Sequence, residues 1–508
     1  MKLKEFSATP FTHFYNFSED IFLRVHHSLV EKSQFFNIST SKTIERSEDF
    51  FSFSYKQISG ITELIADKMF AAGLVNQKII PILTSNPFDL ILSVISLWRN
   101  NAVSVPLNIH LLKNDLEEQI NFLKVENIIC ETNFANDFPS LIKFSFSNIP
   151  LNNLILSTDF QASDTAVLLF TSGTSGKPKA VPLSYDNLSA AFNAGNSVFN
   201  YSKNDSWYLN LPLYHIGGFS ILTRAILAGS SIILPESNEL DSLKSNLDFA
   251  KPTLVSLVPT QLKRICENGI YPNKELRAAL IGGGFSDETI LTQAVNLGWK
   301  IFKVYGSTET SAFITALTSD DFEQKSKSIG KPLSNIEIKI FDPERNALQS
   351  NKVGEIGVRA LSVFDKYFSN EGDSNSAFYD KYYLTGDFGF LDNDGYLYIA
   401  NRRTDLIVSG GENISPLEIE NVIMLFQNID EVCVFGLPDK EWGEIVTAVV
   451  TTKDKREINQ TELKKFLHEK LPPFKTPKKY FQLEEFPKSA IGKIKRSEVK
   501  ELFNSSHT

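Results

Sequence analysis

The order of apolar segments is the feature that most restricts how this chain can fold. Between Ile58 and Met69, apolar residues recur at helical spacing, and the pattern stops before Gly73. Short apolar runs then alternate with helical patterns, which predicts strands over 78–83, 102–107 and 127–130 and helices over 88–99 and 111–122. Because such alternation implies parallel sheets covered by helices, we predict an α/β fold.

A second region of the same kind follows. A predicted strand over 278–281 runs into three glycines, a helix extends to Gly298, and a further strand covers 301–305. The motifs after these two strands therefore stand at carboxyl ends, where open α/β sheets bind their ligands.

The later part of the chain has a different pattern. From Ile336 to Tyr398 the apolar period is two and the turns are rich in glycine, which predicts a small antiparallel β subdomain. Beyond Arg403, strand and helix patterns mix, with a helix near 460–471 and a basic tail. We expect a separate, small α+β domain there.

The segment 168–182, LLFTSGTSGKPKAVP, has the composition of a phosphate-binding loop. Its glycines allow positive φ and inward-pointing backbone N–H groups, its hydroxyl residues add donors, and Lys177 and Lys179 add charge. It is not a Walker A loop, because Pro178 stands where that loop needs the Ser or Thr that holds magnesium. Pro178 also disfavours a helix at this point. An ordinary surface loop is the alternative interpretation.

The order TSGTSGKPKAV resembles the signature of the adenylate-forming superfamily, which includes acyl-CoA and aryl-CoA ligases, luciferases and the adenylation domains of peptide synthetases. Further motifs follow in that superfamily's order: YGSTE at 305–309, YLTGD at 383–387, RRTD leading into SGGEN at 402–413, and the segment 487–493. The resemblance covers nearly the whole chain. It implies an N-terminal AMP-binding domain of parallel-sheet α/β subdomains plus the antiparallel subdomain over 1–403, and a mobile C-terminal domain over 404–508.

The resemblance also implies roles for individual residues. Glu309 would ligate Mg²⁺ beside the phosphates of ATP, Asp387 would accept hydrogen bonds from the ribose with help from Arg402, and Thr404 aligns with the hinge. Lys493 would contact the acid and the α-phosphate during adenylation and withdraw for the thioester step. The implied catalytic residues are Lys493, Thr171 and Glu309. The implied nucleotide-binding residues are Thr171, Ser172, Gly173, Thr174, Ser175, Gly176, Lys177, Gly283, Tyr305, Gly306, Ser307, Thr308, Asp387, Arg402 and Lys493.

Each of these residues also has a plainer interpretation when it is taken alone. Glu309 would be a solvated surface acid, Asp387 a turn residue, Arg402 an ion-pair partner and Lys493 a solvated lysine in a basic tail. The ordered set of motifs favours the functional roles.

Two segments bear on the thiol and on the acid. Ser409, Gly410 and Gly411 resemble the segment that lines the CoA tunnel of the ligases. We expect a stand-alone ligase without a carrier domain that bears a phosphopantetheine serine. The segments 211–225, 256–262 and 280–284 resemble those of o-succinylbenzoate-CoA ligases of menaquinone biosynthesis. The implied acyl-pocket residues are His215, Gly217, Gly218, Gly282 and Gly283.

Several side chains keep two interpretations at this point. Gly217 stands where the succinylbenzoate enzymes commonly carry Ser, so another group must satisfy the second carboxylate, whose unpaired burial is costly. Arg224 is a candidate partner, and a helix-surface or structural arginine is the alternative. His215 would border the pocket or be a satisfied core histidine. Lys475, Lys478 and Lys479 would meet the CoA phosphates or form a solvated face.

Composition excludes other classes of function. A formal net charge of -9 argues against nucleic acid as the main partner, because such binders present concentrated positive charge. The three cysteines lie far apart and indicate neither a disulfide framework nor a zinc site. The N-terminus has no apolar signal region, and no window is apolar enough to span a membrane. We therefore expect a cytoplasmic protein, with a homodimer as one option for its oligomeric state.

The predicted function is that of an acid-CoA ligase that requires ATP, CoA and Mg²⁺, forms an acyl-adenylate and then a thioester, and acts on o-succinylbenzoate. A medium-chain fatty-acid or aryl acid-CoA ligase is the alternative among enzymes. A nucleotide-binding relative without catalysis is the alternative from another class.

Overall fold

A computed structural model describes residues 19–33, 44–47, 49–131, 134, 138, 142–144, 164–171, 179–237, 239–284, 288–401, 407–487, 494 and 496–504. The chain divides into two compact units. The first comprises Met1–Ile109, Glu117–Phe170 and Ala180–Asn401, and the second comprises His110–Leu116, Thr171–Lys179 and Arg402–Thr508. Each unit is described by itself below.

The largest sheet of the first unit has a parallel centre and antiparallel edges. From edge to edge its strands are β16 (Lys331–Pro332), β15 (Ala312–Leu317), β14 (Ile301–Ser307), β13 (Ala278–Ile281), β12 (Leu254–Leu257), β10 (Ser206–Tyr208), β11 (Ser231–Leu234), β1 (Ile21–His26), β3 (Phe50–Ser54) and β2 (Glu45–Arg46). The predicted strands at 278–281 and 301–305 are neighbours here, with Ile281 opposite Lys303.

A second sheet contains the strands predicted from the first alternating region. Its order is β7 (Ile142–Phe144), β6 (Asn127–Cys130), β4 (Ile79–Leu83), β5 (Val103–Pro106), β8 (Thr165–Thr171) and β9 (Lys179–Ser184). The pairings of β4 with β5 and β6, of β5 with β8 and of β6 with β7 are parallel. Helix α4 (Pro87–Arg99) begins where Pro87 follows the N-cap Asn86, a favoured helix start. The α/β prediction is confirmed.

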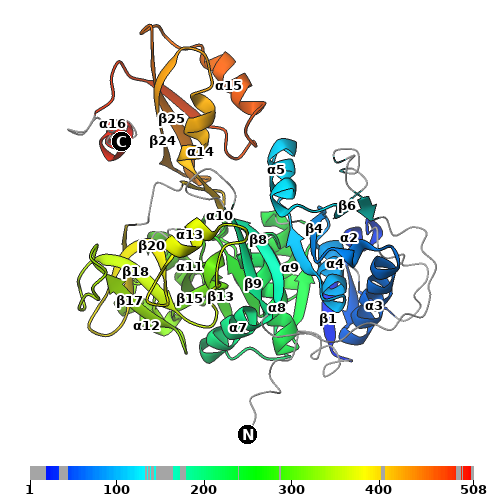
Figure 1. The fold of residues 1–508 in the computed structure, drawn as a ribbon. Helices are drawn as coiled ribbons and strands as arrows, with labels where there is room; N and C mark the ends of the chain where they lie inside the picture. The colour runs from blue at the N-terminus through cyan, green and yellow to red at the C-terminus, as the bar shows by residue number, and fades with distance from the viewer. Residues whose placement is uncertain are drawn as a thin grey trace. The chain divides into compact units, whose positions relative to one another are not determined.

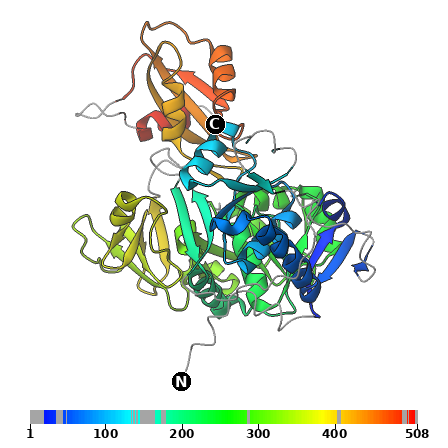
Figure 2. The same cartoon turned by 45° about the vertical axis from the view of Figure 1, so that its right-hand side comes forward.

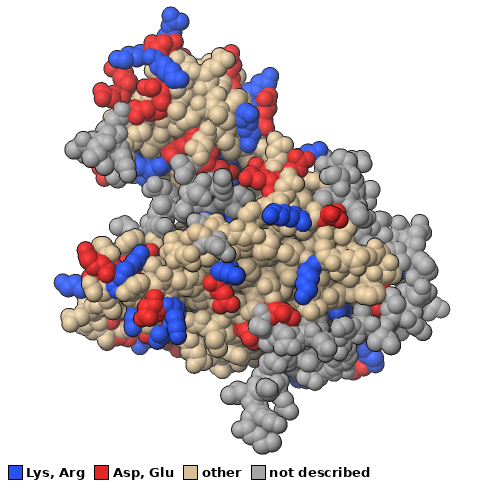
Figure 3. Space-filling view, in the orientation of Figure 1, with Lys and Arg blue, Asp and Glu red and all other residues tan. Residues whose placement is uncertain are grey.

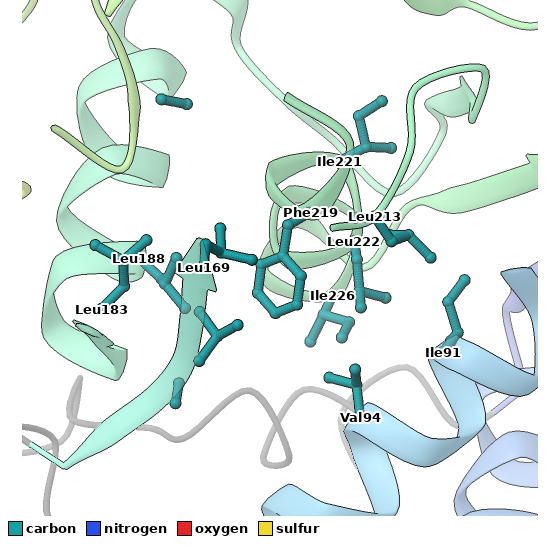
Figure 4. Close-up of a cluster of buried hydrophobic side chains, with 14 of the residues drawn as sticks. Ile91, Val94, Leu169, Leu183, Leu188, Leu213, Phe219, Ile221, Leu222 and Ile226 are labelled. Carbon is teal, nitrogen blue, oxygen red and sulfur yellow. The ribbon is translucent and has the colours of Figure 1, made fainter. Parts of the chain in front are cut away.

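Helix α8 (Ile216–Ala228) is the centre of the apolar core between these sheets. Leu222 and Ile226 point toward Val94 of α4, while Phe219 lies next to Leu169 of β8 (Figure 4). All residues from Gly218 to Ile226 are buried, so this helix has no solvent-facing stripe over that stretch. A helix that is buried all round must satisfy any polar side chain inside the protein.

The third sheet is the predicted antiparallel subdomain. Its strands are β17 (Glu337–Phe341), β18 (Gly354–Arg359), β20 (Tyr382–Leu391) and β19 (Phe378–Tyr379), with β21 (Leu397–Asn401) paired to β20. Figures 1 and 2 show this sheet, in yellow, at the end of the first unit opposite the blue N-terminal strands.

The second unit contains a sheet of its own. Its order is β23 (Glu412–Ile414), β22 (Ile407–Ser409), β25 (Gly443–Thr452) and β24 (Ile429–Asp439), with β26 (Lys479–Gln482) parallel to β25. Helices α14 (Pro416–Ile423), α15 (Gln460–His468) and α16 (Arg496–Asn504) complete it. Ile419 and Leu463 are fully buried in its apolar core.

The remaining helices lie in the sequence before Arg402. They are α2 (His27–Glu31), α3 (Tyr55–Ala71), η3 (Leu74–Asn76), α5 (Lys113–Leu123), α7 (Tyr185–Phe199), α9 (Leu240–Phe249), α10 (Pro259–Glu267), α11 (Glu288–Asn296), η4 (Thr308–Thr310), α12 (Ser319–Lys325) and α13 (Glu371–Ser376). None of the helices in the described part of the chain is long and apolar enough to cross a membrane. Acidic and basic side chains are interspersed over the face shown in Figure 3.

Candidate active site

The predicted phosphate loop joins two neighbouring strands. Thr171 ends β8 and Lys179 begins β9, and the Thr171 hydroxyl donates a hydrogen bond of 3.4 Å to the Lys179 carbonyl oxygen. The structure therefore closes the base of the loop. The predicted site residues Ser172, Gly173, Thr174, Ser175, Gly176, Lys177, Arg402, Thr404 and Lys493 lie outside the described residues.

Tyr305 and Asp387, which the motifs suggested for the nucleoside, meet in the structure. The Tyr305 hydroxyl donates to Oδ2 of Asp387 at 2.7 Å. Asp387 lies inside β20, which continues to Leu391, whereas the plainer interpretation made it a turn residue. The strand can continue because it bulges against β18, with a register shift around Gly386, whose φ is +74°. Bulges re-aim side chains beside functional sites, and this one places Asp387 on Tyr305.

Glu309 lies in η4, directly after β14, where Gly306, Ser307 and Thr308 lead into it. Oε1 of Glu309 accepts a hydrogen bond of 3.0 Å from the Tyr367 hydroxyl. Its backbone carbonyl accepts one of 2.8 Å from the Phe364 N–H. Oε2 has no hydrogen bond within the described ranges. Among the described side chains, the carboxylate is therefore held through Oε1.

The predicted acyl-pocket residues lie in two places, at the start of α8 and directly after β13. His215 is the N-cap of α8, and its ring centroid is 4.8 Å from that of Tyr214. A Cβ at Gly218 would lie 2.2 Å from the Pro212 carbonyl oxygen, whereas one at Gly217 would meet only the Leu211 side chain, at 3.3 Å. Gly218 is thus required by close packing, and Gly217 leaves room for a small side chain. Gly282 and Gly283 directly follow β13.

Arg224 is buried, with 4 % of its surface exposed, so the helix-surface interpretation is wrong. Its guanidinium lies 4.3 Å from the ring centroid of Phe313 and 5.8 Å from that of Trp207. Burial lowers its pKa, and no carboxylate of the described residues forms an ion pair with it. Nearby, the Tyr201 hydroxyl and the Trp207 indole N–H are buried, and neither has a hydrogen-bond partner in the part of the chain that the structure describes.

These three groups share one chemical property. The guanidinium and the indole N–H can only donate, and the phenol hydroxyl can donate as well as accept, so donors outnumber acceptors in this cluster. A buried anion or water would satisfy it.

The predicted CoA segment forms a tight hairpin in the second unit. Ser409 pairs with Glu412 across a turn made by Gly410 and Gly411, whose φ values are +60° and +92°. Two successive positive φ values are the requirement of a type I′ hairpin turn, which glycine meets without strain. The turn packs on Trp442, where a Cβ at Gly410 would lie 3.0 Å from the indole ring.

The three lysines considered for the CoA phosphates differ in their surroundings. Lys475 forms an ion pair of 2.6 Å with Glu418 and has a side chain only 10 % exposed, so it is neither solvated nor unpaired. Lys478 lies 3.7 Å above the Trp442 ring, and Lys479 begins β26.

Comparison with known proteins bears on the family. The AMP-binding enzyme family matches residues 39–368, and the AMP-binding enzyme C-terminal domain matches residues 418–493. The chain belongs to the AMP-binding enzyme family. A 2-succinylbenzoate--CoA ligase of Listeria monocytogenes is 32% identical over 454 residues, covering 88% of this chain and 94% of that protein. One of Oceanobacillus iheyensis is 32% identical over 470 residues, covering 91% and 96%.

Solved structures of this AMP-binding family share the fold. A double mutant of o-succinylbenzoate CoA synthetase from Bacillus subtilis, bound with its product analogue OSB-NCoA, matches with a TM-score of 0.88 and 26% identity. The match covers 97% of this chain and 98% of that one. The Bacillus subtilis enzyme in complex with ATP and magnesium ion matches with a TM-score of 0.70 and 26% identity, over 97% and 98%.

Sequence reasoning missed the side chains that support the motif residues. Tyr367, Phe364 and Tyr383 surround Glu309, yet the aromatic segment that holds two of them gave no periodic signal. The hydroxyl of Tyr201 was also missed, because no local pattern in the sequence places it beside Arg224.

Proposed function

We propose that this AMP-binding enzyme is an acid-CoA ligase that joins 2-succinylbenzoate to CoA at the expense of ATP, through an acyl-adenylate. The observation that carries the proposal is the 32% identity to 2-succinylbenzoate--CoA ligases over about nine-tenths of both chains. The pairing of Tyr305 with Asp387 and the half-held carboxylate of Glu309 support it.

Mg²⁺ is part of the proposal, and the donor set fits this ion. Magnesium is usually held by one or two carboxylates together with substrate phosphates, and not by an all-protein cage. Glu309 offers one such carboxylate oxygen, and no cluster of three potential ligands occurs among the described residues. Bound there, the ion would offset the negative charge that builds on the phosphates during adenylation.

The chain's own residues would then do the following. Backbone N–H groups of the Thr171–Lys179 loop and Lys177 hold the phosphates, while Asp387 accepts hydrogen bonds from the ribose hydroxyls. Lys493 contacts the acid and the α-phosphate during adenylation. We place the boundary between the domains at 403–404, with Thr404 as the hinge and with Ser409 to Gly411 beside the pantetheine of CoA.

The buried donor cluster supports a substrate with a second carboxylate. Arg224 with Tyr201 and Trp207 supplies positive charge and an excess of donors, and burying a carboxylate requires such partners. This cluster would bind the second carboxylate in place of the serine that the succinylbenzoate enzymes commonly carry at the position of Gly217. His215 would border the same pocket.

Location in the cytoplasm is also proposed. The three cysteines, Cys130, Cys266 and Cys433, are free thiols, which is common where the surroundings are reducing.

A coupled assay that counts AMP tests the activity. The enzyme is given ATP, Mg²⁺ and CoA with 2-succinylbenzoate, and in parallel with benzoates, coumarate and C6 to C16 fatty acids. We expect AMP and the CoA thioester with 2-succinylbenzoate, at a kcat/KM well above that of every monocarboxylate. Preference for a monocarboxylate would overturn the substrate, and AMP from none of these acids would overturn the proposed activity.

A further inference from the structure

Tyr367 is a buried residue whose hydroxyl is committed to Glu309. Its side chain is in the segment between β18 and α13, it is 7 % exposed, and its hydroxyl donates to Oε1 of Glu309 at 3.0 Å. The Tyr367 backbone N–H donates to the Ser374 hydroxyl at 3.0 Å. The ring packs on Phe364, with centroids 4.7 Å apart and an interplanar angle of 62°. Backbone and ring are therefore both fixed.

The same segment also holds the backbone of Glu309. The Phe364 N–H donates to the Glu309 carbonyl oxygen at 2.8 Å. Two contacts, one to the main chain and one to the carboxylate, thus come from residues three apart in the sequence. Because both the backbone and the carboxylate of Glu309 are held, its side chain loses little further freedom when it binds a ligand.

Tyr383 extends the network from β20. Its side chain is 5 % exposed, and burial raises its pKa well above the ordinary value. The negative charge of Glu309 and a hydrogen bond with Tyr367 raise the pKa further. Tyr383 therefore stays neutral and keeps its hydroxyl proton at physiological pH. Tyr383, Tyr367 and Glu309 form one chain of hydrogen-bonding groups that ends at Oε1.

A neighbouring pair shows what a purely structural contact of this type looks like. Tyr382, next to Tyr383 on β20, donates its hydroxyl to Glu337. Glu337 also forms ion pairs with Arg359 and with Lys339, so cations neutralise it. Glu309 forms no ion pair with a lysine or arginine of the described ranges. The described contact on its carboxylate is therefore the neutral Tyr367 hydroxyl, which orients the carboxylate without cancelling its charge.

We propose that Tyr367 is a positioning residue, whose hydroxyl fixes Oε1 of Glu309 and leaves Oε2 for the divalent cation that accompanies ATP. The proposal deepens the proposed function and rests on it. A neutral donor suits this task better than a lysine, because a cation on the carboxylate would repel the metal ion.

The test compares ATP affinity with and without Mg²⁺, measured by titration calorimetry on the full chain without acid or CoA. The dissociation constant of ATP without Mg²⁺, divided by that with Mg²⁺, reports the coupling between metal and nucleotide. We expect Tyr367→Phe to lower this ratio by about tenfold, as losing a hydrogen bond to a charged group would. Tyr382→Phe, which also removes a tyrosine-to-glutamate hydrogen bond, should leave the ratio unchanged.

Two further variants keep the proposal falsifiable. Tyr383→Phe removes only the outer hydroxyl and should lower the ratio to a smaller extent. In a Glu309→Gln background, Tyr367→Phe should have no further effect on the ratio, because the group through which it acts is gone. A further fall in that background, or an unchanged ratio in Tyr367→Phe alone, would overturn the proposal. If the unmodified chain itself shows no effect of Mg²⁺ on ATP affinity, the proposed function fails, and this inference with it.

Discussion

Replacing Arg224 by methionine should separate substrate selectivity from stability. If the guanidinium pairs with the second carboxylate of the acid, its removal costs a hydrogen bond to a charged group, about 1.5–3 kcal/mol. That corresponds to a fall of roughly 10- to 150-fold in kcat/KM for 2-succinylbenzoate. A monocarboxylate such as benzoate makes no such contact, so its kcat/KM should change by less than about twofold.

The same change should not destabilise the unliganded fold. Arg224 is buried without an ion-pair partner among the described residues, and desolvating a charge costs several kcal/mol, which stacking on Phe313 offsets by about 2 kcal/mol. Methionine fills similar volume without that cost. We expect an unchanged or higher melting temperature. Because burial lowers the pKa of Arg224, the cost is fully present at neutral pH and fades only as the pH rises above the folded pKa.

Arg277→Met is the matched control. Arg277 lies in the same unit but pairs with the buried Asp205 through two contacts of 2.7 Å. Its loss should lower the melting temperature and leave the ratio of kcat/KM values for the two acids unchanged. The reasoning is refuted if Arg224→Met loses activity equally on both acids while its melting temperature falls, because Arg224 would then be structural.

Three further predictions follow from single residues. Lys493→Ala should lower adenylation by about 100- to 1,000-fold and spare thioester formation from premade acyl-adenylate, and an equal loss in both half-reactions would contradict its role. Gly217→Ser should fold with a near-normal melting temperature, whereas Gly218→Ala should not, since its Cβ would lie 2.2 Å from the Pro212 carbonyl oxygen; equal thermal stability would count against this packing. Burial lowers the pKa of Lys303 to about 8 from 10.5, so its destabilising effect is fully present below pH 8 and declines as the pH rises toward 10.5. Urea unfolding should therefore show Lys303→Met more stable than the unmodified chain at pH 7.5, by a margin that shrinks at pH 10, and a constant margin would disprove the assignment.

Local sequence pattern was sufficient for the elements. The strand at 278–281 was predicted with the observed bounds, and the helix at 88–99 differs from α4 by one residue, because their apolar periods and flanking Gly and Pro residues are strong signals. Taken alone, Asp387 was interpreted as a turn residue. A bulge paired to β18 instead kept it within β20, which depends on a strand distant in sequence.

The environment of side chains was less predictable. The residues of α8 from Gly218 to Ile226 are all buried. The position of Arg224 inside the protein therefore follows from how the whole helix is packed. The donors on Glu309 come from a segment with no regular period, and only the folded chain shows that they converge. Motif order predicted which residues carry the chemistry, and the tertiary contacts show which other residues touch Glu309 and Asp387.

The dual attachment of β20 has a practical consequence for exchanging parts between relatives. One strand carries both Tyr383, which lies beside Tyr367 and the Glu309 carboxylate, and Asp387, which meets Tyr305. A one-residue slip in a strand turns every side chain to the opposite face, so an insertion or deletion in β20 would disconnect both groups together. A chimera assembled from two such ligases should therefore inherit residues 301–391 from a single parent, with its crossovers placed outside that stretch.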